Sequence, residues 1–304
     1  MFLPYRYIFQ RTGRPRFSFI RKHPVFSGIF CLIAILIFAS WLPDIDRSPK
    51  IGVIEVNGII LESESTIKEI RTFEKNPLIK GIMIHINSPG GAVAPSQEIF
   101  SEILRVRKKK KVYASISTVA ASGGYYIAVA AEKIFSNPGS LTGSIGVIIQ
   151  NFNVENLMSK IGVKSQVIKS GKNKDLGSSF RSMKSEERKL LEAVISDTHE
   201  QFVQAIFSNR NIEIKKLREV ADGRVFTGKQ AFSMGFVDQL ASFRESIDGL
   251  KADLNLTGEI GLIYPPKIDE SILLQFLQST LSPIKDLLTK QAALYLYQGN
   301  QISY

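Results

Sequence analysis

The chain has 304 residues, which suffices for one large domain or two small ones with a hydrophobic core. A content of 44% hydrophobic and 22% charged residues excludes a disordered or fibrous protein. The net charge of +11 is concentrated at the N-terminus, where six basic residues precede Asp44, the first acidic residue. Because this basic segment adjoins an apolar one, we interpret the charge as a membrane-topology signal and expect no nucleic-acid partner.

A membrane anchor is predicted at residues 24–43. These twenty residues include no charged side chain and, as a helix, would span roughly 30 Å, the thickness of the hydrocarbon core. A cleaved signal peptide usually has a shorter apolar region that ends in small residues, whereas the last residues of this stretch include the bulky Phe38 and Trp41. We therefore expect a retained single-pass anchor, a cytoplasmic basic segment at residues 1–23, and a chain outside the cytoplasm from about residue 45 onward.

Strand and helix patterns alternate after the anchor. Helices are predicted at residues 65–75, from residue 95 onward and at residues 122–131. Strands are predicted at residues 51–56, 81–86, 112–117, 133–135, 145–149 and 166–169. Repeated strand–helix units of this length indicate an α/β fold with largely parallel strands.

Two further helical segments follow. Residues 185–209 are predicted to form a long amphipathic helix, with Glu186 and Glu187 in its first turn where they oppose the helix dipole. Residues 263–304 include an apolar helical stripe and are predicted to form a C-terminal helical extension. We expect this extension to pack on an oligomer or to occupy a substrate groove.

Ser122 is the first candidate catalytic residue. It lies between a predicted strand and a predicted helix, where a serine often serves only as the N-cap. The small residues before it leave its hydroxyl accessible, and the backbone N–H of Gly123 can reach a developing oxyanion. The sequence NSPGG at residues 87–91 also follows a predicted strand, and it is typical either of a turn or of a second source of oxyanion-binding N–H groups.

The residue pattern does not identify the base that would activate Ser122. The three histidines are poorly placed, because His23 flanks the anchor, His85 lies in a predicted strand and His199 lies in the middle of a predicted helix. A lysine can act as the base when burial or nearby cations lower its pKa. The chain has many lysines, and composition does not select among them.

Five motifs, in their order along residues 51–262, resemble bacterial signal peptide peptidase A in its short, single-repeat form. They are SPGG at 88–91, ASGGYY at 121–126, LTGSIGV at 141–147, SGKNKD at 170–175 and ADGRV at 221–225. The resemblance implies a Clp-protease/crotonase-like α/β fold and a peptidase domain at residues 50–262.

The resemblance also implies roles for individual residues. Ser122 matches the nucleophile, Lys174 the general base and Ser144 the serine that hydrogen-bonds this lysine. Gly91 and Gly123 match the positions of the oxyanion hole.

Lys172 is a competitor of Lys174 because both lie in the same motif. The resemblance favours Lys174, the lysine that directly precedes Asp175. Since an ion pair with Asp175 would keep Lys174 protonated, we expect Asp175 to point elsewhere.

The function implied is that of a membrane-bound serine endopeptidase that hydrolyses remnant signal peptides with a serine–lysine dyad. The implied setting is the bacterial inner membrane, with the catalytic domain outside the cytoplasm and the subunits arranged in a homo-oligomeric ring. A dyad within one chain and a dyad across a subunit interface both remain open. No cofactor is implied, and no cluster of His, Cys or carboxylate residues has the spacing of a metal site. The alternatives are a membrane quality-control peptidase of the same fold, a crotonase-like acyl-binding protein and a non-catalytic scaffold.

Overall fold

The structure is a computed structural model that describes residues 29, 32–33 and 48–266. The basic segment, nearly all of the predicted anchor and most of the predicted C-terminal extension lie outside the described residues. Within the described part of the chain, no helix is long and apolar enough to cross a bilayer. The chain divides into two units, Met1–Arg47 and Ser48–Tyr304, and the fold below is that of the second unit.

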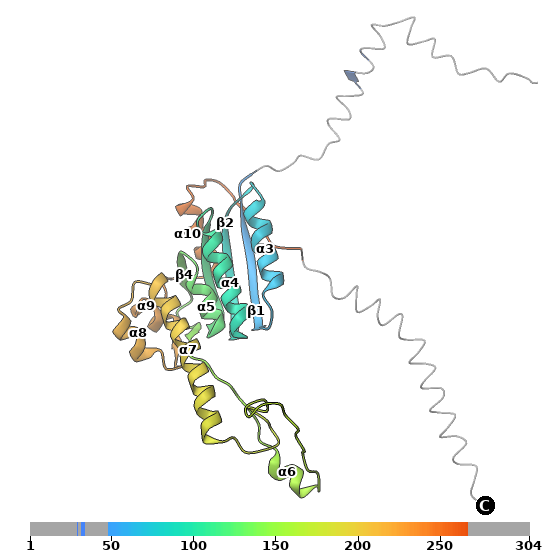
Figure 1. The fold of residues 1–304 in the computed structure, drawn as a ribbon. Coiled ribbons are helices and arrows are strands. Elements are labelled where there is room, and N and C mark those ends of the chain that lie inside the picture. The colour runs from blue at the N-terminus through green and yellow to red at the C-terminus, as the bar shows by residue number, and fades with distance from the viewer. Residues whose placement is uncertain (1–28, 30–31, 34–47, 267–304) are drawn as a thin grey trace, which may run out of the picture. The chain divides into compact units, whose positions relative to one another are not determined.

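An eight-stranded sheet forms the centre of this unit (Figure 1). Its strands are β1 (Lys50–Ile60), β2 (Ile79–Gly91), β3 (Lys111–Ala121), β4 (Lys133–Ser136), β5 (Leu141–Gly143), β6 (Val225–Thr227), β7 (Gln239–Leu240) and β8 (Gly261–Ile263). The order is β6-β5-β3-β2-β1-β8, while β4 pairs with both β3 and β7. Every pair is parallel except β5–β6. The predicted α/β class with a largely parallel sheet is therefore confirmed, while the Clp-protease/crotonase-like assignment stays a prediction.

Helices cover both faces of the sheet. They are α3 (Glu64–Lys75), α4 (Val93–Val106), α5 (Gly123–Val129), α6 (Glu155–Lys160), α7 (Ser185–Asn209), α8 (Ile214–Val220), α9 (Gly228–Ser233) and α10 (Phe243–Asp253). The larger apolar core joins one face of the sheet to α3, α4, α5 and α7, and a smaller core joins the other face to α10. Strand β2 contributes Ile84 to the larger core and its neighbour Met83 to the smaller one. Because both faces are buried, β2 is a continuous apolar run rather than an alternating one.

The three central strands are longer than predicted. β1 continues beyond residue 56, and β2 continues beyond residue 86. The pairing register shifts between Asn57 and Ile59 in β1 and between Ile86 and Ser88 in β2. β3 pairs with β4 along its first half and with β5 along its second half. The extra length carries β3 to Ala121, so that it ends directly before Ser122.

Two predicted strands do not form. Residues 145–149 and 166–169 belong to no strand, and the short strand in this part of the chain is β5. Both segments have apolar residues suited to a strand, but a strand also requires a partner to pair with. Ile148 is 84% exposed and Ile168 is fully exposed, which agrees with the lack of a partner within the described chain. In contrast, α3, α4, α5 and α7 form where helices were predicted, and α7 has the predicted bounds.

Candidate active site

Ser122 occupies a strained turn between β3 and α5. Its backbone angles are φ 50° and ψ −120°, a combination that residues with a Cβ atom rarely adopt. Although Ser122 is the residue before the helix, its side chain makes no capping hydrogen bond. Ser122 therefore does not serve as a side-chain N-cap of α5. The hydroxyl is half-buried and forms no hydrogen bond with another described residue, so it is free to react.

Backbone hydrogen bonds hold Ser122 in this conformation. Its N–H donates to the carbonyl of Gly143 at 2.9 Å, and its carbonyl accepts from the N–H of Tyr126 at 2.9 Å. All residues of α5 are buried, so the helix that follows Ser122 is fixed by packing. The surroundings thus impose a conformation that the serine alone would not favour.

The backbone of Gly91 lies beside the first turn of α5. A Cβ atom added to Gly123 would lie 3.4 Å from the Gly91 nitrogen, and one added to Gly90 would lie 2.7 Å from the Gly123 nitrogen. Gly90 also has φ 101°, which favours glycine. The N–H of Gly123 belongs to the first helical turn, where such groups have no partner inside the helix. The sequence SPGG is therefore not a free turn, because it forms the end of β2 and lies against the turn at Ser122.

A small pocket opens next to Ser122. Its volume is about 30 Å³, comparable to the space for a single water molecule or a methyl group. It is lined by Gly91, Val93, Ser96, Gln97, Ser122, Gly123, Tyr126, Gly146, Val147, Thr198 and Phe202. The contribution of α7 to this pocket was not predicted from the sequence. The only available signal was that Thr198 and Phe202 are four residues apart, which places them on one face of a helix.

Ser144 lies close to Ser122 through the strand pairing of β5. Gly143 pairs with Ala121, and the next residue, Ser144, has φ 49° and donates its N–H to the carbonyl of Arg224 at 2.8 Å. The Ser144 hydroxyl forms no hydrogen bond with another described residue. Ser144 is thus a second serine with a strained backbone and an unused hydroxyl, positioned by the strand that abuts the end of β3.

Lys174 is not brought to Ser122 within this chain. It lies in residues 148–184, which we call the arm, and α6 in this segment lies away from the sheet (Figure 1). The Lys174 side chain is exposed, makes no hydrogen bond or ion pair with a described residue and does not line the pocket at Ser122.

Other charged residues of the arm form ion pairs within the arm or with the first turn of α7. Asp175 pairs with Lys169 and Arg181 rather than with Lys174, as expected, and these cations hold its pKa well below the usual range. Lys172, the competitor of Lys174, forms an ion pair with Glu186 at 2.5 Å. This exposed carboxylate raises the pKa of Lys172, which is unfavourable for a base.

Neither of the described histidines reaches the pocket at Ser122. His85 packs its ring against Phe243 at 4.4 Å, and burial lowers its pKa. His199 lies on α7, and its Nε2 is buried without a hydrogen-bond partner. Neither residue lines the pocket, so the described chain presents no serine–histidine pair. Within residues 48–266, no three His, Cys, Asp or Glu side chains gather as metal ligands would.

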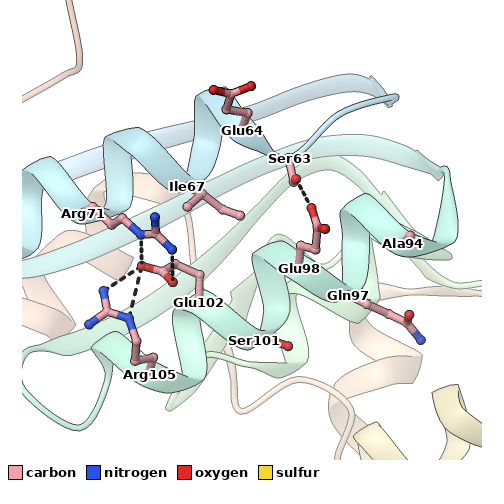
Figure 2. A pocket seen from close by; sticks show the side chains of 10 residues that line it. All are labelled: Ser63, Glu64, Ile67, Arg71, Ala94, Gln97, Glu98, Ser101, Glu102 and Arg105. Atoms are coloured by element: carbon pink, nitrogen blue, oxygen red, sulfur yellow. Dashed lines mark hydrogen bonds and ion pairs between the residues drawn. The ribbon is translucent and has the colours of Figure 1, made fainter.

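A larger hollow of about 810 Å³ lies between α3 and α4 (Figure 2). Several of its polar groups bind each other: Arg71 and Arg105 both donate to the buried carboxylate of Glu102, and Ser63 donates to Glu98. It is not lined by Ser122 or by the glycines beside it. Since both arginines are already paired with Glu102, this hollow has the features of a helix–helix contact rather than of a catalytic site.

Residues 105–257 match peptidase family S49. The chain is 43% identical over 195 residues to "Putative protease slr0021" of Synechocystis, covering 64% of this chain and 70% of that protein. It is 33% identical over 229 residues to "Putative signal peptide peptidase SppA" of Enterococcus faecium, covering 71% of this chain and 67% of that protein. Among solved structures, a mutant of ClpP1 from Listeria monocytogenes superposes with a TM-score of 0.46 at 19% identity, covering 64% of this chain and 94% of that chain. The chain therefore belongs to peptidase family S49, whose members are serine peptidases.

Proposed function

We propose that Ser122 is the nucleophile of a serine endopeptidase. The observation that carries this proposal is its strained turn, where the hydroxyl is uncapped, accessible and adjacent to the backbone N–H groups of Gly91 and Gly123. In this mechanism the Ser122 oxygen attacks the carbonyl carbon of the scissile peptide bond. The two N–H groups then bind the oxyanion of the tetrahedral intermediate, helped by the positive end of α5.

Lys174 is proposed as the general base, supplied by a neighbouring copy of the chain. A lysine works as a base only when it is neutral, which requires burial away from water or a nearby cation. Lys174 is exposed in the single chain and does not line the Ser122 pocket, so a site within one chain would need the arm to move. A site across an interface needs only that the arm of one subunit packs beside Ser122 of the next, which would bury the lysine. Lys174 would then accept the Ser122 proton and later donate it to the leaving amine, and Ser144 would hold its ammonium group in place.

The arm has the surface expected of such an interface. No residue from 148 to 184 is buried, and all hydrogen bonds of this segment lead to itself or to the first turn of α7. Phe152 is 71% exposed, and Leu157 and Ile161 on and beside α6 are also largely exposed. Apolar surface of this extent in a soluble segment marks a contact with another protein. Each subunit would give its arm to one neighbour and receive an arm from another, and we propose that the rotation between subunits closes this head-to-tail assembly into a ring.

The proposed substrates are remnant signal peptides and other extended peptides at the membrane. The pocket of about 30 Å³ admits only a small side chain next to the scissile bond. We propose that residues 24–43 anchor the chain in the bacterial inner membrane, with its N-terminus in the cytoplasm and the peptidase domain outside, where such substrates are released. Membrane quality control by the same chemistry is the second candidate, and it would be favoured if misfolded membrane proteins were cut faster than signal peptides.

Activity of the full chain in detergent on a fluorogenic peptide tests the residue roles. Ser122→Ala and Lys174→Ala should each abolish cleavage, whereas Lys172→Ala should retain it. Loss of activity in Lys172→Ala with activity retained in Lys174→Ala would contradict the assignment of the base.

A mixed assembly distinguishes a dyad across an interface from one within a chain. Ser122→Ala and Lys174→Ala chains, each inactive alone, should regain part of the wild-type rate when they are co-expressed and purified together, because Ser122 of one can meet Lys174 of the other. Each chain co-expressed with a copy of itself under a second tag is the control. A mixture as inactive as these controls would show that both groups must come from one chain.

A further inference from the structure

A row of lysines marks the edge of the sheet where its parallel strands begin. β1 to β4 are adjacent parallel strands, and each starts with a lysine at its first or second position: Lys50, Lys80, Lys111 and Lys133. Since neighbouring strands lie about 4.8 Å apart, these four starts occupy an edge roughly 15 Å wide.

The ends of α3 and α4 add further lysines at the same edge. α3 ends at Lys75, and α4 leads directly into the run of lysines at residues 108–111, which enters β3. Lys110 donates to the carbonyls of Phe73 and Asn76 at 2.8 and 2.7 Å, so the two helix ends meet at this edge. We call Lys50, Lys75, Lys80, Lys108–Lys111 and Lys133 the basic rim.

Acidic residues compensate only part of the basic rim. Its ion pairs include Lys109–Glu74, Lys111–Glu132 and Lys133–Asp253. Lys75, Lys80 and Lys108 are exposed and form no side-chain hydrogen bond or ion pair with any described residue. The negative end of a helix explains Lys75 and Lys108. It does not explain Lys80, because a strand start has no comparable dipole.

We propose that the basic rim binds the anionic phospholipid headgroups of the membrane, and so orients the peptidase domain on the bilayer. This inference rests on the anchor included in the proposed function. The predicted anchor ends at residue 43, seven residues before Lys50 begins the rim at β1. An extended chain of that length reaches at most about 25 Å, so the anchor would hold this edge near the headgroups, where a lysine is attracted to anionic lipid. A nucleic acid is a poorer fit, because no exposed aromatic side chain accompanies the unpaired lysines for base stacking.

Lysine acetylation of the full chain in lipid nanodiscs tests the proposal. Discs of phosphatidylcholine alone are compared with discs that also contain phosphatidylglycerol, and the acetylation rate of each lysine is read by mass spectrometry. In the anionic discs, Lys75, Lys80 and Lys108 should react about fivefold more slowly, the factor expected for a lysine held at an anionic surface. Lys68 is the matched control, because it is exposed on α3 but lies seven residues, or about 10 Å, before Lys75. Its rate should change little, and high salt should remove the protection of the rim.

A variant with Lys75→Gln, Lys80→Gln and Lys108→Gln separates rim binding from folding. It should keep its peptidase activity in detergent. Lys109, another member of the basic rim, should be labelled more slowly in anionic discs in the wild type and should lose this protection in the variant. Equal labelling of the rim in both kinds of disc, with the protein retained in them, would overturn the proposal and leave the anchor intact. Failure of the wild-type chain to enter discs would instead refute the anchor. Protection by duplex DNA but not by anionic lipid would overturn lipid binding in favour of a nucleic-acid surface.

Discussion

Replacing Ser122 by glycine should stabilise the protein relative to replacing it by alanine. At φ 50° and ψ −120°, a residue with a Cβ atom carries strain of about 1–3 kcal/mol, and alanine retains this strain while glycine does not. Glycine has the greater freedom in the unfolded chain, which costs about 0.5–1 kcal/mol in return. The net expectation is that Ser122→Gly has a free energy of unfolding higher by about 1 kcal/mol than Ser122→Ala, or a melting temperature higher by about 2–4 °C.

Ser101 provides the matched control. It is exposed within α4, in ordinary helical backbone, where glycine should be less stable than alanine by about 1 kcal/mol. The sign of the glycine–alanine difference should therefore reverse between the two sites, with a total separation of about 2 kcal/mol. Thermal and urea unfolding of the four full-length variants in one detergent measures this separation. If Ser122→Gly proves as unfavourable as Ser101→Gly, the turn at Ser122 is not strained and the structural argument for its reactivity loses its basis.

Three further outcomes follow from the site and from the helix ion pairs. Gly123→Ala should lower kcat/KM by roughly a hundredfold, because its methyl group would lie 2.4 Å from the Ser96 Oγ and beside an oxyanion donor. Adding Ser96→Ala should restore the stability of this variant but not its activity. Recovery of both stability and activity would contradict the oxyanion role of Gly123. Val147→Ala should widen the pocket and raise the cleavage of peptides with a larger side chain before the scissile bond, measured as a ratio of kcat/KM values against an alanine peptide. Hydrogen bonds, chiefly from Arg105, hold the pKa of Glu74 at about 2, below its unfolded value of about 4.3. This carboxylate therefore stabilises the fold above about pH 4.3 and loses that contribution as the pH falls toward 2. The difference in unfolding free energy between wild type and Glu74→Gln should accordingly shrink on acidification from neutral pH, and a difference that does not change with pH would refute this reading.

The sequence predicted the elements whose signals are local. The helix at residues 185–209 was predicted with its observed bounds, because its charged first turn and apolar periodicity lie within the helix itself. The extent of β2 was not predictable in this way. Residues 87–91 have the composition of a turn, yet Gly90 and Gly91 pair with Ile59 and Ile60, which are some thirty residues earlier in the chain. Pairing between distant segments overrode local preference here, as it commonly does in sheets.

In the candidate site, too, the features that depend on local sequence were predictable and those that depend on tertiary contacts were not. Ser122 could be selected from its neighbours because a strand, small residues and glycines around a serine have a direct chemical meaning. The strained backbone at Ser122 and Ser144 could not be predicted, since it is imposed by the contacts of β5 with β3 and of Ser144 with Arg224. The contribution of Thr198 and Phe202 to the pocket was missed for a similar reason, because it depends on where α7 packs.

The wrong strand predictions and the isolated position of Lys174 have a common explanation in the proposed assembly. Residues 145–149 and 166–169 have the apolar, β-branched composition of strands, and Lys174 has the motif of a base. Ile145 is buried in the larger core, but Ile148, Ile168 and Lys174 are exposed in the single chain. Except for residues 145–147, these segments lie in the arm, where no residue is buried. A neighbouring subunit would supply what each is missing: a strand edge or apolar surface for the two segments, and Ser122 for Lys174. The assembly therefore predicts that both segments become protected from hydrogen exchange in the oligomer, and that the protection is lost together with activity when the oligomer is dissociated.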